Sequence, residues 1–433
     1  MLTEKRKRTL LFVAQRLCSR KALIIPKSIK DIPLEQYFTR ELHLKENRTI
    51  FLSDFGYKQF RTVVEILAQA DLLDGLAEYS DIWNASRKVL EMWLSDGVQP
   101  ESANEVIQAV ARVVEPDVDD YTFIVPIFGI SLDDTQSLSL GKMTVLHMSS
   151  DVLDLAGIEH SHTDIPRLLE LNKGYLWLKG TTRGTPNVAR RTFSEQATLT
   201  VGMLAIAAAS LYEWGATRFR IGTVMSTEEA IGRSVWFSWR ERDRSLATSY
   251  SFPSAQLLPV NKILNDESDL GRLIHRSFEV IQKQDKTELE EAIARAAYWY
   301  SDAHRDPVGV MQLVKYWSCV EAFFSFEKDE PITHAVSTGL ASILVFGGFR
   351  FAPVSEYVEI KRKIVDLYDL RSQAVHGGVH HHTTERDIAQ FSQWVAWMIV
   401  SMLELLDLGY TALKEVKTQT ERLNTIVENG KKN

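Results

Sequence analysis

The chain has 433 residues, a length that allows two or three domains. Of these residues 45% are hydrophobic and 25% charged, a composition typical of globular proteins. Its two cysteines, Cys18 and Cys319, are too few for a disulfide framework, so we expect a reducing compartment, the cytoplasm. The formal net charge of −7 excludes a global positive field that recruits nucleic acid, so any such contact has to be local.

Residues 1–30 depart from this balance, with nine Lys and Arg against one Glu. The apolar run 9–14 that follows the first basic residues is cut short by Gln15 and Arg16, so we expect no signal peptide. The uncharged stretches 196–212 and 388–403 fall short of the roughly 20 residues of a membrane span, so we expect no membrane partner. The basic start is interpreted as a solvated helix end in preference to an arm that contacts RNA.

The first two predicted domains differ in their predicted secondary structure. Residues 1–115 are predicted to be mostly helical, with helical periodicity over 57–76, 81–94 and 102–114. Residues 116–265 are predicted to be mixed α and β, and we expect them to form a sensing or regulatory domain. Their predicted elements are a long Ala-rich helix at 192–214 and strands at 121–128, 140–148, 175–178, 218–224 and 234–239.

The third predicted domain, residues 266–412, is an all-α bundle. Its predicted helices are 270–284, 287–303, 308–326, 332–345, 355–376 and 384–408. Residues 413–433 are predicted to be a polar C-terminal tail that frays. The expected fold class is therefore α+β multidomain, with a helical and mixed α/β N-terminal region before a C-terminal helical bundle.

The most informative segment is 367–378, Leu-Tyr-Asp-Leu-Arg-Ser-Gln-Ala-Val-His-Gly-Gly, in which Arg371 precedes His376 by five residues. Upstream, apolar residues at helical spacing predict a face against the bundle core; they are Tyr357, Ile360, Ile364, Leu367 and Tyr368. Gly377 and Gly378 supply the left-handed backbone that ends a helix, so we expect His376 in the last turn.

Arg371 and His376 suit the cleavage of a phosphodiester. An imidazole titrates near neutral pH and transfers protons, and a guanidinium fork matches two phosphate oxygens. The negative end of the helix dipole favours imidazolium, which suits His376 to general acid catalysis or phosphate binding. Five residues turn a regular helix by about 140°, so the two side chains do not point the same way unless the last turn unwinds.

This segment is similar to the HEPN superfamily, and specifically to the Apea-like HEPN group, whose hallmark is an Arg, four to six intervening residues and a His. The helical segment 312–324 and the long apolar helix after the motif also fit, so the likeness covers roughly 270–410. It implies a metal-independent endoribonuclease with Arg371 and His376 catalytic and Ser372, Gly377 and Gly378 supporting. It also implies a homodimer whose motif helices form one shared cleft.

The resemblance further implies a role in prokaryotic antiviral defence by abortive infection, or in a toxin system, with RNA as substrate and a phage-derived or protein trigger. Nuclease members often carry Asn, Asp or His directly after the Arg, whereas this chain has Ser372. The alternative is therefore a non-catalytic HEPN module that binds RNA, nucleotide or a protein partner. On the residues alone, Arg371 could instead pair with Asp366 or Asp369, with His376 satisfying terminal carbonyls.

Further RNA-binding candidates lie outside the motif. His380 and His381, next to His382, could contact phosphate or gather a metal, and the bland interpretation is a polar loop. Trp239, Arg240 and Arg242 could form a base-stacking platform, although a half-buried strand is the commoner case.

Two other polar clusters have solvated surface as the favoured interpretation. They are His160, His162 and Asp164, and the basic set Lys179, Arg183, Arg190 and Arg191. The sequence contains no phosphate-binding loop, dinucleotide fingerprint or kinase motif, so we expect no cofactor and no obligatory metal.

Overall fold

The computed structural model describes residues 2–25, 39–70, 72–133, 135–149, 173–223, 234–239, 246–251, 256–265, 268–325, 331–377 and 383–430, with residues 152, 167, 169 and 170. The chain divides into two compact units. Unit 1 comprises Met1–Phe123 with Thr181–Phe193, and unit 2 comprises Ile124–Gly180 with Ser194–Asn433. The boundaries predicted at 115, 265 and 412 stay predictions.

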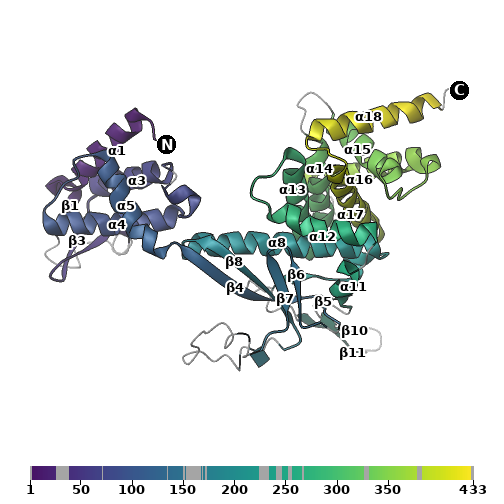
Figure 1. The fold of residues 1–433 in the computed structure, drawn as a ribbon, viewed down its shortest axis with the longest axis horizontal. Helices are drawn as coiled ribbons and strands as arrows, with labels where there is room; N and C mark the ends of the chain where they lie inside the picture. Colours follow the sequence, from purple (N-terminus) through teal and green to yellow (C-terminus); the bar gives the residue numbers. More distant parts are fainter. Residues whose placement is uncertain are drawn as a thin grey trace. The chain divides into compact units, whose positions relative to one another are not determined.

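Unit 1 combines four main helices with a small sheet (Figure 1). The helices are α1 (Glu4–Leu17), α3 (Asp54–Ala68), α4 (Tyr79–Asp96) and α5 (Ala103–Val114). The strands β1 (Leu23–Ile24), β2 (Glu41–Leu44) and β3 (Arg48–Leu52) form an antiparallel sheet in the order β1-β3-β2. This sheet is not among the predicted elements, because strands of two to five residues leave little periodicity to detect.

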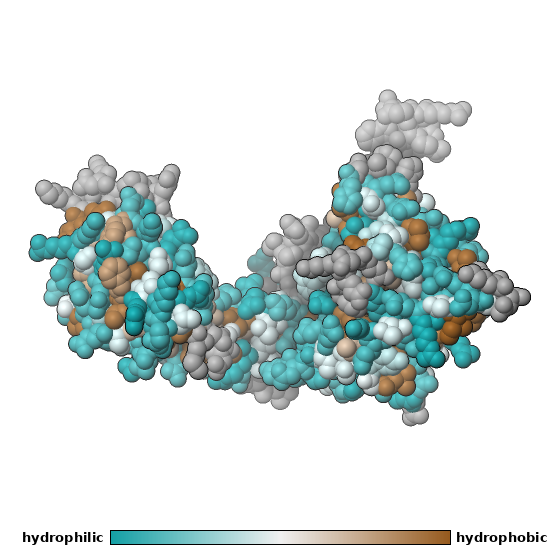
Figure 2. All heavy atoms as spheres, turned by 90° about the horizontal axis from the view of Figure 1, so that it is seen from above, coloured by the Kyte–Doolittle hydropathy of each residue, from teal (hydrophilic) through white to brown (hydrophobic). Residues whose placement is uncertain are grey.

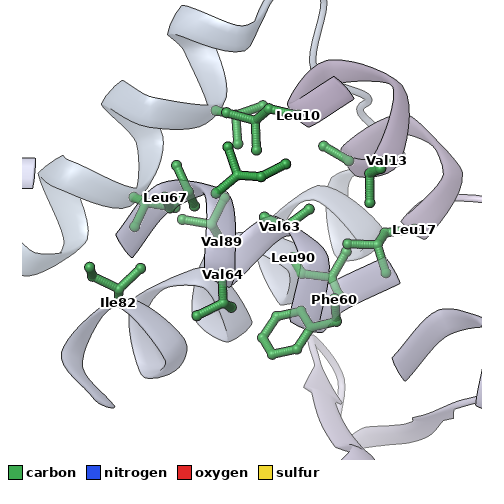
Figure 3. Close-up of a cluster of buried hydrophobic side chains, with 14 of the residues drawn as sticks. Leu10, Val13, Leu17, Phe60, Val63, Val64, Leu67, Ile82, Val89 and Leu90 are labelled. Atoms are coloured by element: carbon green, nitrogen blue, oxygen red, sulfur yellow. The ribbon is translucent and has the colours of Figure 1, made fainter. Parts of the chain in front are cut away.

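The core of unit 1 is built from α1, α3, α4 and α5, and the side chains labelled in Figure 3 come from the first three of these helices. The labelled members are Leu10, Val13, Leu17, Phe60, Val63, Val64, Leu67, Ile82, Val89 and Leu90. The prediction of one helix over 57–76 is wrong at its end: α3 stops at Ala68 and a short 3-10 helix, Leu72–Gly75, follows. The predicted helices at 81–94 and 102–114 agree with α4 and α5 to within two residues at each end.

A five-stranded sheet in the order β6-β7-β8-β4-β9 belongs to the mixed region. Its strands are β4 (Asp119–Phe128), β6 (Ser137–Leu140), β7 (Met143–Leu146), β8 (Leu176–Gly184) and β9 (Gly222–Thr223). The expected strand 140–148 is instead a hairpin, because Gly141 turns the chain with a φ of +62° between β6 and β7. The expected strand 218–224 is only partly confirmed, since Gly222–Thr223 forms β9 whereas Arg218 ends the short helix α9 (Gly215–Arg218).

Helix α8 (Pro186–Leu211) lies along this sheet (Figure 1), with Thr200 of α8 donating to the Met143 sulfur of β7 at 3.5 Å. Its small residues also allow close approach to the bundle, since a Cβ on Gly202 would lie 2.5 Å from the Ala297 carbonyl oxygen. The β6–β7 hairpin is tied to the bundle by Gln282, whose side chain accepts from Lys142 N and donates to the Leu140 carbonyl at 2.9 Å.

Smaller elements complete the mixed region. β5 (Ile130–Ser131) pairs in parallel with β12 (Leu258–Pro259), and β10 (Ser234–Trp239) pairs antiparallel with β11 (Leu246–Ser251). Helix α11 (Val260–Leu264) leads into the bundle. The predicted strand at 234–239 therefore agrees with β10.

The C-terminal part of unit 2 is a helical bundle, as predicted, and its helices up to α17 match the predicted ranges closely. They are α12 (Asp269–Gln282), α13 (Glu288–Arg305), α14 (Gly309–Phe324), α15 (Ile332–Phe346), α16 (Tyr357–Gly377), α17 (Glu385–Asp407) and α18 (Leu413–Gly430). Helix α14 packs against α13, α15, α16 and α17, and its Trp317 is fully buried. The bundle core is therefore built around α14.

The fraying predicted for residues 413–433 is wrong for 413–430, which form α18 and pack against α15. The sequence does not indicate this contact, because the buried face of α18 contains polar residues, Thr420 and Asn424, beside Leu413 and Val416. The Asn424 Oδ1 accepts from the Tyr357 hydroxyl and from Lys361 Nζ, each at 2.9 Å.

Hydrophobic residues form scattered patches among hydrophilic ones on the face drawn in Figure 2. Among the described helices, none has the length and apolar character needed to cross a membrane.

Candidate functional site

The motif helix α16 presents its apolar stripe to the bundle as predicted. Tyr357, Ile360, Ile364, Leu367 and Tyr368 are each less than 10% exposed. The indole Nε1 of Trp317 on α14 donates to the Leu367 carbonyl at 3.3 Å. Because this hydrogen bond joins α14 to α16, the residues one turn further along α16 also lie against α14.

Arg371 lies on α16 one turn after this anchor and faces α14. Its Nη2 is 3.2 Å from Oε1 of Glu321, and the two side chains are 21% and 23% exposed. The guanidinium carbon also lies 5.5 Å from the ring centroid of Tyr368. Neither Asp366 nor Asp369 holds Arg371, so the pairing inferred from the residues alone is corrected to a contact between two helices.

The Arg371–Glu321 ion pair leaves hydrogen-bonding capacity unused. Within the described part of the chain, Arg371 Nε and Glu321 Oε1 are both buried and have no hydrogen-bond partner. Buried polar atoms are normally paired, so each unpaired one calls for an explanation such as a ligand or water. A guanidinium with a free donor on its fork is suited to an anionic oxygen.

The electrostatics of the pair follow from partial burial. Burial raises the pKa of Glu321 above its usual value, and the positive charge of Arg371 only partly opposes this. Burial likewise raises the pKa of Tyr368, reinforced by the Glu321 carboxylate and opposed by Arg371. Glu321, Tyr368 and Arg371 therefore form one coupled polar cluster at the edge of the bundle core.

His376 occupies the last turn of α16, as expected, and Gly377 is the final helical residue. The His376 side chain is exposed. The helix stays regular through this turn, so Arg371 and His376 remain about 140° apart around its axis and roughly 7 Å apart along it. Unwinding of the last turn, which would let the two side chains point the same way, is not observed. Ser372 is half-buried on the same helix.

Several predicted site residues lie outside the described residues. These are Gly378, His380, His381, His382, Arg240, Arg242, His160, His162 and Asp164. Trp239 is the last residue of β10, which pairs with Leu246 of β11.

Two members of the basic set, Arg183 of β8 and Arg191 of α8, form surface ion pairs in unit 1. Arg183 lies 3.7 Å from Asp120, and Arg191 lies 3.5 Å from Glu78. This agrees with the interpretation of these residues as solvated surface.

Sequence reasoning missed Glu321. The available signal was a lone carboxylate in the apolar run 316–324 of a core helix, four residues after Trp317 and so on its side of α14. A charge at such a position needs a partner, but its identity depends on how α14 packs against α16.

No three His, Cys, Asp or Glu side chains gather as metal ligands in the part of the chain that the structure describes. No family model, curated protein or solved structure matches the chain.

Proposed function

We propose that the chain is a HEPN-type, metal-independent endoribonuclease that acts as a homodimer in the cytoplasm, in prokaryotic antiviral defence or a toxin system. The observation that supports this most directly is the arrangement at the end of α16. An arginine with an unused buried donor lies five residues before an exposed histidine in the last turn.

The proposed chemistry assigns a role to each side chain. RNA cleavage by its own 2′-hydroxyl passes through a crowded phosphorane whose equatorial oxygens carry negative charge. As the 2′-oxygen bonds to phosphorus, its hydroxyl proton would pass to solvent water, and Arg371 would bind the equatorial oxygens through its guanidinium. His376 would protonate the 5′-oxygen as its bond to phosphorus breaks, which leaves a 2′,3′-cyclic phosphate.

Glu321 is proposed to be a positioning residue. Its carboxylate lies 3.2 Å from Arg371 Nη2 and leaves Nε without a protein acceptor. A fixed guanidinium loses little conformational entropy when it binds phosphate.

The homodimer is the part of the proposal that the HEPN resemblance implies, and the spacing of the two side chains supports it. Side chains about 140° apart on a regular helix do not face one phosphate from within a single chain. A two-fold axis beside the ends of two α16 helices would place the Arg371 of one chain near the His376 of its partner.

The second candidate function is a non-catalytic module that binds RNA, nucleotide or a protein. The observation that favours it is that Glu321 already neutralises Arg371, beside a serine at position 372. The arginine would then be a structural partner of α14.

Incubation of the full-length chain with total RNA and a chelator tests these alternatives. Under the nuclease proposal, the chain cuts RNA, and both Arg371→Ala and His376→Ala abolish cutting. Matched controls, Arg362→Ala on the exposed side of α16 and His275→Ala on the exposed side of α12, should cut as the parent does.

Because the proposal includes a trigger, a silent protein is tested further by expressing the same variants in phage-infected cells. RNA decay in infected cells that depends on His376 supports the nuclease. Equal behaviour of the parent and the His376→Ala variant, in infected cells and in the tube, rules it out in favour of the binding module.

A further inference from the structure

Helix α1 in unit 1 carries cations and an aromatic ring along one side. Lys5, Arg8, Phe12 and Arg16 are spaced by three or four residues, so they share one face of the helix, and all four are exposed. We call this set the α1 stripe. Lys5 and Arg16 are separated by roughly 16 Å along the helix axis.

The orientation of the stripe is set by the core of unit 1. The opposite side of α1 buries Leu10, Val13, Ala14 and Leu17, and α1 packs there against α3 and α5. Because the apolar side of α1 is packed in the core of unit 1, the α1 stripe faces away from that core. Phe12 nevertheless leaves 55% of its surface exposed, which is unusual for a phenylalanine.

Rings and cations alternate beyond the end of the stripe. The Arg16 guanidinium carbon lies 4.5 Å from the centroid of the Phe12 ring and 5.6 Å from that of Phe55 on α3. Lys21 Nζ lies 5.0 Å from the Phe55 centroid. A flat guanidinium resting on a ring offers a second plane on which a base can stack.

The local charge is strongly positive. Residues 1–30 contain nine Lys and Arg and one Glu in a chain whose net charge is −7. That glutamate, Glu4, pairs with Lys7 at 3.0 Å, off the stripe. Among the residues that the structure describes, no carboxylate forms an ion pair with Lys5, Arg8 or Arg16.

We propose that the α1 stripe, continued by Phe55 and Lys21, binds single-stranded nucleic acid. The cations bind successive phosphates and the two rings stack with unpaired bases, the combination by which proteins bind single strands without reading sequence. A membrane surface fits less well, because an amphipathic helix inserts its apolar side, and that side of α1 is buried in protein. The proposal holds whether or not Arg371 and His376 cut RNA.

Binding is measured on the full-length chain carrying His376→Ala, so that RNA stays intact if the chain is a nuclease. The probes are fluorescent oligouridine and oligothymidine, each also as a duplex with its complement, over a salt series. We expect single strands to bind more tightly than duplexes, and the RNA and DNA arms tell which nucleic acid is preferred. Phe12→Ala should weaken single-strand binding roughly tenfold through lost stacking.

The charge component is tested by Arg8→Gln combined with Arg16→Gln. Loss of two phosphate contacts should flatten the log–log salt dependence by about 1.4, since each contact with a single strand contributes about 0.7. The matched control, Lys88→Gln with Arg112→Gln, removes the same charge from exposed positions on α4 and α5. It should leave the salt slope unchanged.

Three results would each overturn the proposal. They are oligonucleotide binding that neither set of stripe substitutions weakens, a control pair that weakens it equally, and binding to anionic phosphatidylserine vesicles without binding to oligonucleotides. Thermal unfolding of each variant confirms that it is folded, as expected for exposed positions.

Discussion

At the scale of single residues, Arg371 depends on one carboxylate, and removing either partner leaves a half-buried charge uncompensated. Because both side chains are about one-fifth exposed, solvent screening should limit the cost of Arg371→Ala or Glu321→Gln to roughly 1–3 kcal/mol. The double variant should be more stable than the sum of the two single effects predicts. Urea unfolding of the four proteins measures this coupling, and strict additivity would contradict the ion pair.

The Arg371→Ala variant should also respond to pH in a defined direction. Burial already raises the pKa of Glu321, and loss of the positive charge raises it further, so the folded protein then binds a proton more readily than the unfolded chain. The variant is therefore closer in stability to the parent below the raised pKa of Glu321, and the difference in the free energy of unfolding grows as pH rises through that pKa. Unfolding at neutral and mildly acidic pH should show the larger penalty at neutral pH.

His304 on α13 predicts the opposite pH dependence for the parent chain. Its Nε2 accepts from Ile221 N at 3.1 Å, and burial, with the positive charge of Arg220, lowers its pKa from 6.5 to about 4. Between these values the unfolded chain holds more protons than the folded one, so stability falls as pH decreases, by about 3 kcal/mol in all.

Urea unfolding from pH 7 down to pH 4 tests the His304 prediction. The fall in the free energy of unfolding over this range should be smaller in His304→Gln than in the parent, and in the exposed control His275→Ala it should equal that of the parent. The parent and His304→Gln losing equal stability over this window would show that other groups cause the acid sensitivity.

At the scale of elements, α18 is held to the bundle by polar contacts as well as apolar ones. Asn424 accepts from Tyr357 and Lys361, and burial lowers the pKa of Lys361 despite the opposing charge of Glu428. Asn424→Ala leaves both donors without this acceptor and should destabilise the docking of α18 by about 1–3 kcal/mol.

Hydrogen exchange over 413–430 measures the docking of α18. Faster exchange should appear in Asn424→Ala and not in Arg422→Ala, which changes an exposed position two residues away. Identical protection in both variants would place the anchor of α18 in its apolar contacts, Leu413 and Val416.

At the scale of the whole molecule, the regular last turn of α16 leads to a test of the proposed dimer. If Arg371 of one chain acts with His376 of the other, a mixture of Arg371→Ala and His376→Ala chains should regain RNA cleavage, because mixed dimers contain one intact pair. If both residues act within one chain, no mixed dimer has an intact site. Activity of the co-refolded mixture, compared with each variant alone, distinguishes these outcomes.

The helical elements were largely predictable because each depends on neighbours in the sequence. Apolar spacing located α12 to α17 closely, and Tyr357, Ile360 and Ile364 identified the buried side of α16. Short elements were missed where pairing with distant segments decides the structure. The sheet of β1, β2 and β3 and the β6–β7 hairpin are examples, since a strand of four residues has no stable conformation without its partners.

The amino-acid sequence alone determined the helical periodicity, the apolar stripe of α16, and the position of His376 in the last turn, because these follow from spacing along one helix. Only the tertiary structure decided that Arg371 meets Glu321 instead of Asp366 or Asp369, and that Asn424 draws α18 onto the bundle. Both contacts join residues at least 50 positions apart, and their formation depends on how whole helices pack, which no local pattern encodes.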